Sequence, residues 1–402
     1  MIRILHTADW HLGQNFYGYD RSGEHQVFLQ WLTEQLVTLQ IDVLLVAGDI
    51  FDTPNPSAAA QRLYYQFLKE ATTACPNLQL IITAGNHDSA ARLEAPNPLL
   101  EMLKVTVRGR ILRTQTGEID YAHYVIPMYN AAHQIEAYCL AVPYLRQGDY
   151  PSAATYAEGV SAFYQALHTE ALKFQKPLVA MGHLQATGAE ISENDRSERT
   201  VIGGLECVPP EAFAADIRYT ALGHLHRAQR VSKRENVRYA GSPIPKTFAE
   251  KNNKQGVYCI ELKEQKTTIE RLVFQPPIRL LSVPRTPKPL DELLLALAAL
   301  PIGEADDTTP FLEVKLAMEA PEPSYKYQIT KILEDKAVRL VRIKDERPAR
   351  QESEFQGITY DQIQKLKPFD LAQDLYQQKY GGHEMPAELK DLFNSIVHHL
   401  DA

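Results

Sequence analysis

Five short apolar runs, each ending in a polar turn, constrain the fold of this chain more than any other feature. They are "IRILHTAD" (2–9), "DVLLVAGD" (42–49), "LQLIITAGNHD" (78–88), "PLVAMGHL" (177–184) and "YTALGHLH" (219–226). Runs of this length that are rich in Val, Ile and Leu are typical of strands buried on both faces. Between them, residues 24–40 and 61–72 place apolar side chains at the spacing of amphipathic helices. Strands that alternate with helices predict a layered α/β domain.

The chain also divides along its length. Its 402 residues exceed what one core usually holds. After about residue 275 the stretch "PPIRLLSVPRTPKPL" is proline-rich and indicates a boundary. A helix near 290–300, a strand at 311–317, a helix near 324–334 and a strand at 337–343 then predict a small α+β module. We expect a first domain over 1–275, this module over 276–346 and a helical tail over 347–402.

The tail carries an apolar stripe at helical spacing. Its members are Leu389, Leu392, Phe393, Ile396, Val397 and Leu400. Such a stripe either packs on its own domain or binds a partner, and its position after an acidic linker favours a partner. The helical pattern at 61–72 leaves a similar choice between core packing and a dimer contact, for which core packing is the simpler interpretation.

Composition excludes several classes of protein. No apolar run approaches the ~20 residues that a membrane span needs, and "MIRILHTADW" turns polar and acidic too soon for a signal peptide. The four cysteines are far apart, which suits a reducing cytoplasm, so we expect a cytoplasmic protein without a membrane. The net charge of −8 disfavours a protein that coats nucleic acid by basic charge alone. Residues 226–238 nevertheless hold five Arg/Lys against one Glu, either to contact DNA phosphates or as an ordinary solvated hairpin.

Polar side chains follow every one of the five apolar runs. Seven of them are imidazole, carboxylate or amide groups: Asp9, His11, Asp49, Asn86, His183, His224 and His226. Because ligands gather at the carboxyl ends of strands in α/β sheets, we expect these side chains to converge. Nitrogen and oxygen ligands without sulfur favour divalent ions such as Mn²⁺, with Mg²⁺ as a possible substitute.

Seven ligands exceed the needs of one ion, so two ions that share a carboxylate fit better. Asp9 and His11, like His224 and His226, are two residues apart and point to the same side of an extended chain. Glycines at 48, 85, 182 and 223 directly precede proposed ligands. Glycine permits tight backbone turns that let such ligands crowd around a small centre.

The ordered motifs D-x-H, GD-x-x-D, GNHD, GH and GHxH resemble those of the calcineurin-like metallophosphoesterase superfamily. The stretches "ILHTADWHLGQNFYGYDR" and "GHLHRAQ…VRYAGSPIP" are similar to the Mre-type nucleases within it. This resemblance implies an αββα-type layered domain, a capping domain and a tail that docks on an SMC-like ATPase. It also implies a homodimer and, with the ATPase, a heterotetramer.

The resemblance assigns roles residue by residue. Asp9, His11, Asp49 and His226 would hold a first metal, and Asp49, Asn86, His183 and His224 a second, with Asp49 bridging. His87 would be the catalytic histidine, and Asp88 could orient its ring. Asp52 stands where archaeal members carry a second active-site histidine, so it is either catalytic or a turn-capping residue.

The function implied is a Mn²⁺-dependent double-strand exonuclease and single-strand or hairpin endonuclease, acting on DNA ends in replication, recombination and repair. A hydroxide between two ions about 3.5–4 Å apart would attack phosphorus in line, and His87 would protonate the leaving oxygen. Two alternatives stay open: a phosphoesterase on a non-DNA substrate, and a scaffold that tethers DNA ends. Protein phosphatases of the superfamily typically read GNHE and carry an arginine after the GD motif, unlike this chain.

Overall fold

The computed structural model describes residues 1–189, 207–318 and 324–346, with a few residues between 369 and 393. By its internal contacts the chain forms two units, Met1–Glu346 and Arg347–Ala402. The first unit contains two six-stranded sheets and a three-stranded sheet. Most of the predicted tail, including most of the apolar stripe at 389–400, lies outside the described residues.

The first large sheet has the order β14-β13-β1-β4-β5-β6. Its strands are β14 (Lys266–Val273), β13 (Gly256–Lys263), β1 (Ile2–Thr7), β4 (Val43–Ala47), β5 (Gln79–Thr83) and β6 (Val105–Arg108). Strands β1, β4, β5 and β6 are parallel to one another, whereas β13 is antiparallel to β1 and β14 is antiparallel to β13. Every residue of β4 is buried, which explains why its sequence is a continuous apolar run.

The second large sheet has the order β11-β12-β10-β9-β8-β7. Its strands are β11 (Gln229–Val231), β12 (Arg234–Tyr239), β10 (Tyr219–Gly223), β9 (Leu178–His183), β8 (Ile135–Ala141) and β7 (Val125–Tyr129). Strands β8, β9, β10 and β12 are parallel. Residues of both sheets share one buried cluster, including Ile4, Leu45 and Ile81 from the first and Val179 and Ala221 from the second. The two sheets therefore pack face to face.

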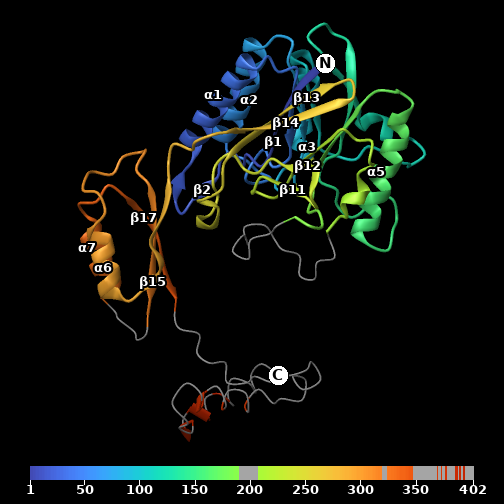
Figure 1. Cartoon of the computed structure of the whole chain (residues 1–402). Helices are drawn as coiled ribbons and strands as arrows, with labels where there is room; N and C mark the ends of the chain where they lie inside the picture. Colours follow the sequence, from blue (N-terminus) through green and yellow to red (C-terminus); the bar gives the residue numbers. More distant parts are fainter. Residues whose placement is uncertain are drawn as a thin grey trace. The chain divides into compact units, whose positions relative to one another are not determined.

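Helices cover the outer faces of this pair of sheets (Figure 1). On the first sheet, α1 (Ser22–Thr38) and α2 (Ala58–Ala74) bury Phe28, Leu32 and Phe67. On the second, α5 (Tyr156–Leu172) packs through the core that includes Phe163. The four layers confirm the predicted αββα fold. Tyr64, Phe67 and Leu68 of α2 pack into the core, as the core-packing interpretation of 61–72 expects.

Shorter elements complete this domain. They are the two-stranded hairpin of β2 (Asn15–Phe16) and β3 (Tyr19–Asp20), the helices α3 (Ala90–Glu94) and α4 (Asn97–Leu100), and the 3-10 turns η1 (Glu101–Leu103), η2 (Tyr121–Tyr124), η3 (Pro210–Ala212) and η4 (Phe248–Glu250). Within the described residues, no helix combines the length and apolar character that a membrane span requires.

The third sheet forms the small module. Strands β15 (Leu280–Lys288), β16 (Phe311–Ala317) and β17 (Arg339–Glu346) are parallel and alternate with α6 (Leu290–Ala298) and α7 (Tyr325–Leu333). Their buried side chains form a separate core that includes Leu293, Val314 and Ile329. The proline-rich stretch is more than a boundary, because most of it is β15. Strand β15 lies at the edge of its sheet, where proline is tolerated.

Candidate metal centre

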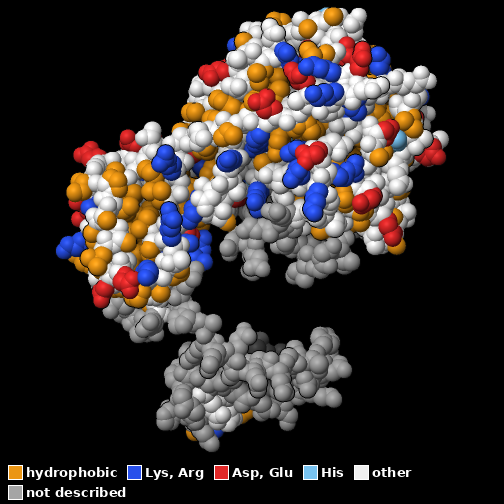
Figure 2. All heavy atoms as spheres, in the orientation of Figure 1, with side chains coloured by type: hydrophobic (Ala, Val, Ile, Leu, Met, Phe, Trp, Pro, Cys, Tyr) orange, Lys and Arg blue, Asp and Glu red, His pale blue; other side chains and the backbone are white. Residues whose placement is uncertain are grey.

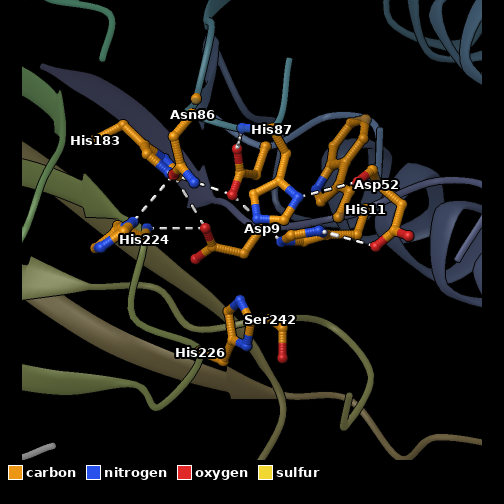
Figure 3. A network of polar contacts seen from close by, with 12 residues as sticks. Asp9, His11, Asp52, Asn86, His87, His183, His224, His226 and Ser242 are labelled. Atoms are coloured by element: carbon orange, nitrogen blue, oxygen red, sulfur yellow. Dashed lines mark hydrogen bonds and ion pairs between the residues drawn. The ribbon is translucent and has the colours of Figure 1, made fainter. Parts of the chain in front are cut away.

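All seven predicted ligands lie at the carboxyl ends of strands from the two large sheets. Asp9 and His11 follow β1, Asp49 follows β4 and Asn86 follows β5; His183 ends β9, and His224 and His226 follow β10. Six of them are labelled in Figure 3, where their side chains converge on one place: Asp9, His11, Asn86, His183, His224 and His226. The first sheet thus provides four of the seven and the second sheet provides three.

The backbone around the site adopts an unusual conformation. Four of the seven residues have positive φ angles: 54° at Asp9, 47° at His11, 51° at Asp49 and 100° at His224. Residues other than glycine rarely adopt this region, and such strain collects at functional sites, where the surrounding structure maintains it. These strained turns therefore position the side chains of the predicted ligands.

Two of the glycines before the ligands are required because other atoms lie too close for a side chain, and not because of a positive φ angle. A Cβ atom at Gly85 would lie 2.1 Å from Asp49 Oδ1, and one at Gly223 would lie 1.9 Å from the carbonyl oxygen of Ala47. At Gly48, where φ is +84°, a Cβ atom would lie 2.1 Å from His183 Nδ1. The crowding predicted from the sequence is present.

Three groups of side chains bring possible ligand atoms within 4.8 Å of one another. They are Asp9, His11 and His226; Asp9, Asp49 and His183; and His11, Asp49 and His87. Asp49 Oδ2 lies 3.4 Å from His11 Nε2 and 3.3 Å from His183 Nε2. The carboxylate of Asp49 is therefore placed between the two sets of ligands.

The remaining predicted ligands are in direct contact with this group. Asn86 Oδ1 lies 2.9 Å from His183 Nε2 and 3.1 Å from His224 Nδ1. The backbone N–H of His224 donates to Asp9 Oδ1 over 2.8 Å. The structure thus brings together all seven residues that the sequence singled out.

The protein holds the outer nitrogen of three of the histidines. His11 Nδ1 lies 3.2 Å from Asp52 Oδ1, His183 Nδ1 lies 2.9 Å from the carbonyl oxygen of Ala47, and His226 Nδ1 lies 3.2 Å from Glu250 Oε1. With Nδ1 protonated toward these acceptors, the Nε2 atoms of His11 and His226 each have a lone pair for the centre. This arrangement is usual for imidazoles that bind metal. At His183 an ion would have to displace the proton that the neighbouring oxygens of Asn86 and Asp49 favour on Nε2.

The donor set fits divalent cations. Within the part of the chain that the structure describes, Asp9 Oδ2, His11 Nε2 and Asp49 Oδ2 are buried and have no hydrogen-bond partner. Buried polar atoms without partners are rare in native proteins, and an ion is one accepted explanation. The three atoms belong to one small region, so a metal site accounts for all of them.

The charges at the site support the same conclusion. Burial raises the pKa of Asp9 to about 6, against the opposing effect of the nearby imidazoles. Burial also opposes a charged His183, but the adjacent Asp49 carboxylate raises the pKa of His183 to about 10. Burial and the charge of Lys246 lower the pKa of His11, which keeps its imidazole neutral, as a ligand must be. Two buried carboxylates need positive charge beside them, and divalent cations supply it.

Asp88 does not have the position expected for a residue that orients the His87 ring. Its carboxylate accepts hydrogen bonds from the backbone N–H groups of Ile50, Phe51 and Gly85, over 2.8 to 3.1 Å. The His87 Nδ1 atom instead lies 3.0 Å from the carbonyl oxygen of Asp52. Asp88 is buried between the loops after β4 and β5 and joins them, which is why it faces backbone amides.

Three further residues support the centre, and two of them carry no recognisable signal in the sequence. Asp52 contacts His11 through its carboxylate and His87 through its carbonyl group, so its role is more than that of a turn-capping residue. Its place in the GD-x-x-D motif was the available signal. Glu250 and the buried Lys246 lie on an irregular turn far along the chain, where no periodicity or motif marked them.

The basic segment at 226–238 is the hairpin of β11 and β12. Arg230 and Arg238 form ion pairs with Glu235, and Arg234 donates to the carbonyl oxygens of Pro210 and Phe213. The guanidinium group of Arg238 also lies over the ring of Tyr258. Much of this basic charge is therefore used within the fold, as the hairpin interpretation expects.

Comparisons with known proteins agree with this geometry. The calcineurin-like phosphoesterase family matches residues 2–228, and the family described as type 5 capsule protein repressor C-terminal domain matches residues 276–380. The SbcD subunit of the SbcCD nuclease from Rhodobacter capsulatus is 38% identical over 86% of this chain and 88% of its own length. The SbcD subunit from Escherichia coli K12 is 36% identical over 66% of each chain.

Among solved structures, a dimetal phosphatase from Danio rerio is similar, with 12% identity and a TM-score of 0.38 over 67% of this chain and 95% of that chain. A calcineurin-like phosphoesterase fold implies a centre of two metal ions, and the convergent ligands at the strand ends are consistent with one. By the extent of the sequence matches, the chain belongs to the SbcD family of metallophosphoesterase nuclease subunits.

Proposed function

We propose that this chain is a Mn²⁺-dependent DNA nuclease subunit that acts with an SbcC-type ATPase. Its activities would be those of a double-strand exonuclease and a single-strand or hairpin endonuclease, in DNA end processing for recombination and repair. The observation that carries the proposal is the convergence of the seven ligands around Asp49. The domain limits 1–275, 276–346 and 347–402 belong to the same proposal. The second family match, which begins at residue 276, supports the first limit, and the division of internal contacts after Glu346 supports the second.

The seven ligands divide into two sets in this proposal. Asp9, His11, Asp49 and His226 hold one ion, and Asp49, Asn86, His183 and His224 hold the other. The short distances from Asp49 Oδ2 to His11 and to His183 support its role as the bridging ligand. When bound, two dications lower the pKa of a water molecule and neutralise phosphate oxygens.

His87 is the proposed catalytic residue. Its Nδ1 donates to the Asp52 carbonyl oxygen, so Nε2 is the atom that exchanges a proton with the leaving oxygen. Its backbone N–H donates to Asp49 Oδ1 over 2.9 Å, which ties the histidine to the carboxylate at the middle of the site. His87 also belongs to one of the candidate ligand groups, so the experiment must separate a ligand from a proton donor.

The surface offers positive charge for a DNA backbone. Figure 2 shows Lys and Arg side chains along this face of the first unit, on the large domain and on the small module. The strands of the module carry Arg285, Lys288 and Arg342 as exposed side chains, with Lys315 and Lys344 half-buried. Phosphate contacts from such residues give affinity without sequence preference, which suits a nuclease that acts on DNA ends.

The proposed assembly is a homodimer that binds two ATPase subunits through the tail, giving a heterotetramer. Three apolar side chains near α4 and η1 support a contact with a second copy: Leu99 is 70% exposed, Met102 83% and Leu103 40%. Adjacent exposed apolar side chains are a surface on which a partner can bury area. The relatives are named as one component of an SbcCD nuclease, which supports the ATPase partner.

One assay tests the proposal. The chain, alone and with its ATPase, is given linear and hairpin DNA with Mn²⁺, with Mg²⁺ or with EDTA. Cleavage is expected with Mn²⁺ and absent with EDTA. His87→Ala is expected to lower the cleavage rate at least about 100-fold, because a proton donor contributes on the order of 10²–10⁴.

The metal content of the same variant distinguishes the two possible roles of His87. A proton donor leaves two Mn²⁺ per chain, measured by plasma emission spectrometry after dialysis, whereas a ligand costs one of them. The exposed His133→Ala variant is the matched control and should cleave normally. Cleavage of phosphoprotein or small phosphoesters but not DNA would favour a non-DNA phosphoesterase, and DNA binding without any cleavage would favour the tethering scaffold.

A further inference from the structure

The turn at 246–251 links the metal centre to the small module. It begins at Lys246, includes η4 and ends at Lys251. Glu250, within it, has a side chain that is 1% exposed, and its Oε1 lies 3.2 Å from His226 Nδ1. Its Oε2 accepts a hydrogen bond from the backbone N–H of Lys246 over 2.8 Å. The backbone of the turn therefore fixes the Glu250 carboxylate, which faces the predicted ligand His226.

This contact determines which nitrogen of His226 faces the ions. A carboxylate at Nδ1 keeps the proton there and leaves Nε2 as the donor atom. The ring of His226 is placed so that a nitrogen groups with Asp9 and His11. Glu250 thus sets both the tautomer and the direction of one ligand without touching an ion itself.

The same turn also packs on the module, through Phe248. The ring centroid of Phe248 lies 5.5 Å from that of Phe16, which lies 5.2 Å from Phe311 of β16. All three belong to a buried cluster that also contains Leu280 of β15. The turn is therefore part of the apolar contact between the large domain and the module.

A polar contact reinforces this junction. Lys251 Nζ donates to Ser282 Oγ of β15 over 2.6 Å, and Ser282 Oγ donates to Glu313 Oε2 of β16 over 3.0 Å. Lys251 directly follows Glu250, so the cation that binds the module and the carboxylate that binds His226 are adjacent. A displacement of one residue moves the other.

The large domain holds the beginning of the turn. Arg21, at the start of α1, is fully buried and pairs with Glu24, and its guanidinium also donates to the carbonyl oxygen of Pro245. The turn is consequently fixed by α1 on one side and by the module on the other. Glu250 lies between these two attachments.

We propose that Glu250 is a positioning residue for His226, and that the module at 276–346 helps set the affinity of the metal centre through the 246–251 turn. The inference rests on the proposed two-metal function and deepens it, because it names what regulates the site. The inference also predicts that changes at Glu250 weaken the metal ion held by His226, since His226 is the ligand that Glu250 contacts.

Titration of the full chain with Mn²⁺ by calorimetry tests the first part. Glu250→Ala is expected to weaken one of two Mn²⁺ sites by about 10- to 100-fold, as loss of a carboxylate behind a ligand histidine does, and to leave the other site unchanged. Glu250→Gln keeps an oxygen that can accept the Nδ1 proton and should restore most of the affinity. It also serves as the folded comparison if the alanine variant is unstable.

A second pair of variants tests the module. Lys251→Met removes the hydrogen bond to Ser282 and keeps the apolar stem; it is expected to weaken the same site by up to about fivefold, the equivalent of one hydrogen bond. Amide hydrogen exchange at residues 224–228 should accelerate in parallel. Lys331→Met makes the same chemical change on α7, away from the turn, and should alter neither quantity.

The outcomes separate the two levels of the proposal. If the unaltered chain binds no Mn²⁺, the two-metal function fails and this inference fails with it. If the unaltered chain binds two ions and Glu250→Ala weakens both equally, or neither, the positioning role is wrong while the function stands. If Lys251→Met behaves like Lys331→Met, the module does not act through the turn.

Discussion

The two central carboxylates each divide their oxygens between the protein and the metal centre. Asp9 Oδ1 accepts the His224 N–H and Asp49 Oδ1 accepts the His87 N–H, while both Oδ2 atoms face the centre without a hydrogen-bond partner among the described residues. One oxygen thus fixes the side chain and the other is left for a cation. This explains how buried acids are kept ready to bind an ion.

A buried histidine near the site predicts how stability depends on pH. Burial, assisted by the positive charges of Lys246 and Arg21, lowers the pKa of His25 to about 3, and His25 Nε2 lies 2.8 Å from the Trp10 carbonyl oxygen. Between pH ~6.5 and ~3 the unfolded chain holds a proton on this residue that the folded chain lacks. The free energy of unfolding is therefore unaffected by the titration of His25 above about pH 6.5. Below that pH, His25 lowers the free energy of unfolding by up to about 1.4 kcal/mol per pH unit.

We expect His25→Gln to reduce the slope of unfolding free energy against pH by the equivalent of one proton. The glutamine amide N–H can still donate to the Trp10 carbonyl oxygen, and the amide does not titrate. Urea unfolding at several pH values from about 7 to about 4.5, with EDTA present, measures the slope for both proteins. Equal slopes for the two proteins would show that His25 already carries a proton in the folded state.

At the scale of elements, the site depends on the two loops after β4 and β5. The Asp88 carboxylate joins them through three backbone amides, and Gly85 lets the second loop approach Asp49. These contacts use backbone groups of both loops, and not only their side chains. Such a framework holds ligands within the narrow tolerance that a metal site needs.

Gly85→Ala should damage both stability and metal binding. The new methyl group would meet Asp49 Oδ1 and the Asp49 backbone nitrogen, at 2.1 and 2.3 Å, so the loops must separate. A loss of about 1–3 kcal/mol in the free energy of unfolding is expected, as for other overpacked sites, with weaker Mn²⁺ binding in calorimetry. Gly23→Ala is the control, since a Cβ atom there meets nothing within 4 Å; an equal effect of both would contradict the steric argument.

These elements also show which features a sequence reveals. The strands that carry Asp9, Asp49, Asn86, His183 and the His224 pair were predictable, because buried parallel strands are continuous apolar runs and their ends are polar. The role of Asp88 was not, since its partners are backbone amides that any residue provides. Glu250 was hidden because η4 has no periodicity, and β15 because an edge strand tolerates prolines that usually indicate a linker.

At the scale of the whole molecule, the ligands come from two sheets, so bound ions join two halves of the domain. We expect the melting temperature to rise with Mn²⁺ and fall with EDTA. An ion at about 100 times its Kd adds about 2.7 kcal/mol per site to the free energy of unfolding. Differential scanning calorimetry measures the shift, and Asp49→Asn, which loses the shared carboxylate, should shift little. An unchanged melting temperature in the unaltered chain would contradict metal binding between the sheets.

The tail gives a prediction about assembly. A chain shortened to residues 1–346 keeps every predicted ligand and should bind Mn²⁺ normally. It should lose the ATPase, because the apolar stripe at 389–400 is the proposed contact. Co-purification with a tagged SbcC-type ATPase measures this, with the charge-reducing Asp391→Asn variant of the full chain as a control. An ATPase that still co-purifies with the shortened chain would place the contact elsewhere.

Strand β1 is synthesised before the other strands of its sheet, yet in the folded sheet it pairs with β4 on one side and with β13, more than 240 residues later in the chain, on the other. The ligands themselves extend from Asp9 to His226. A growing polypeptide therefore cannot form the complete centre until residue 226 has been added, and β1 lacks one of its two neighbouring strands until β13 follows. The order of synthesis thus places hydrolysis after most of the domain has been made.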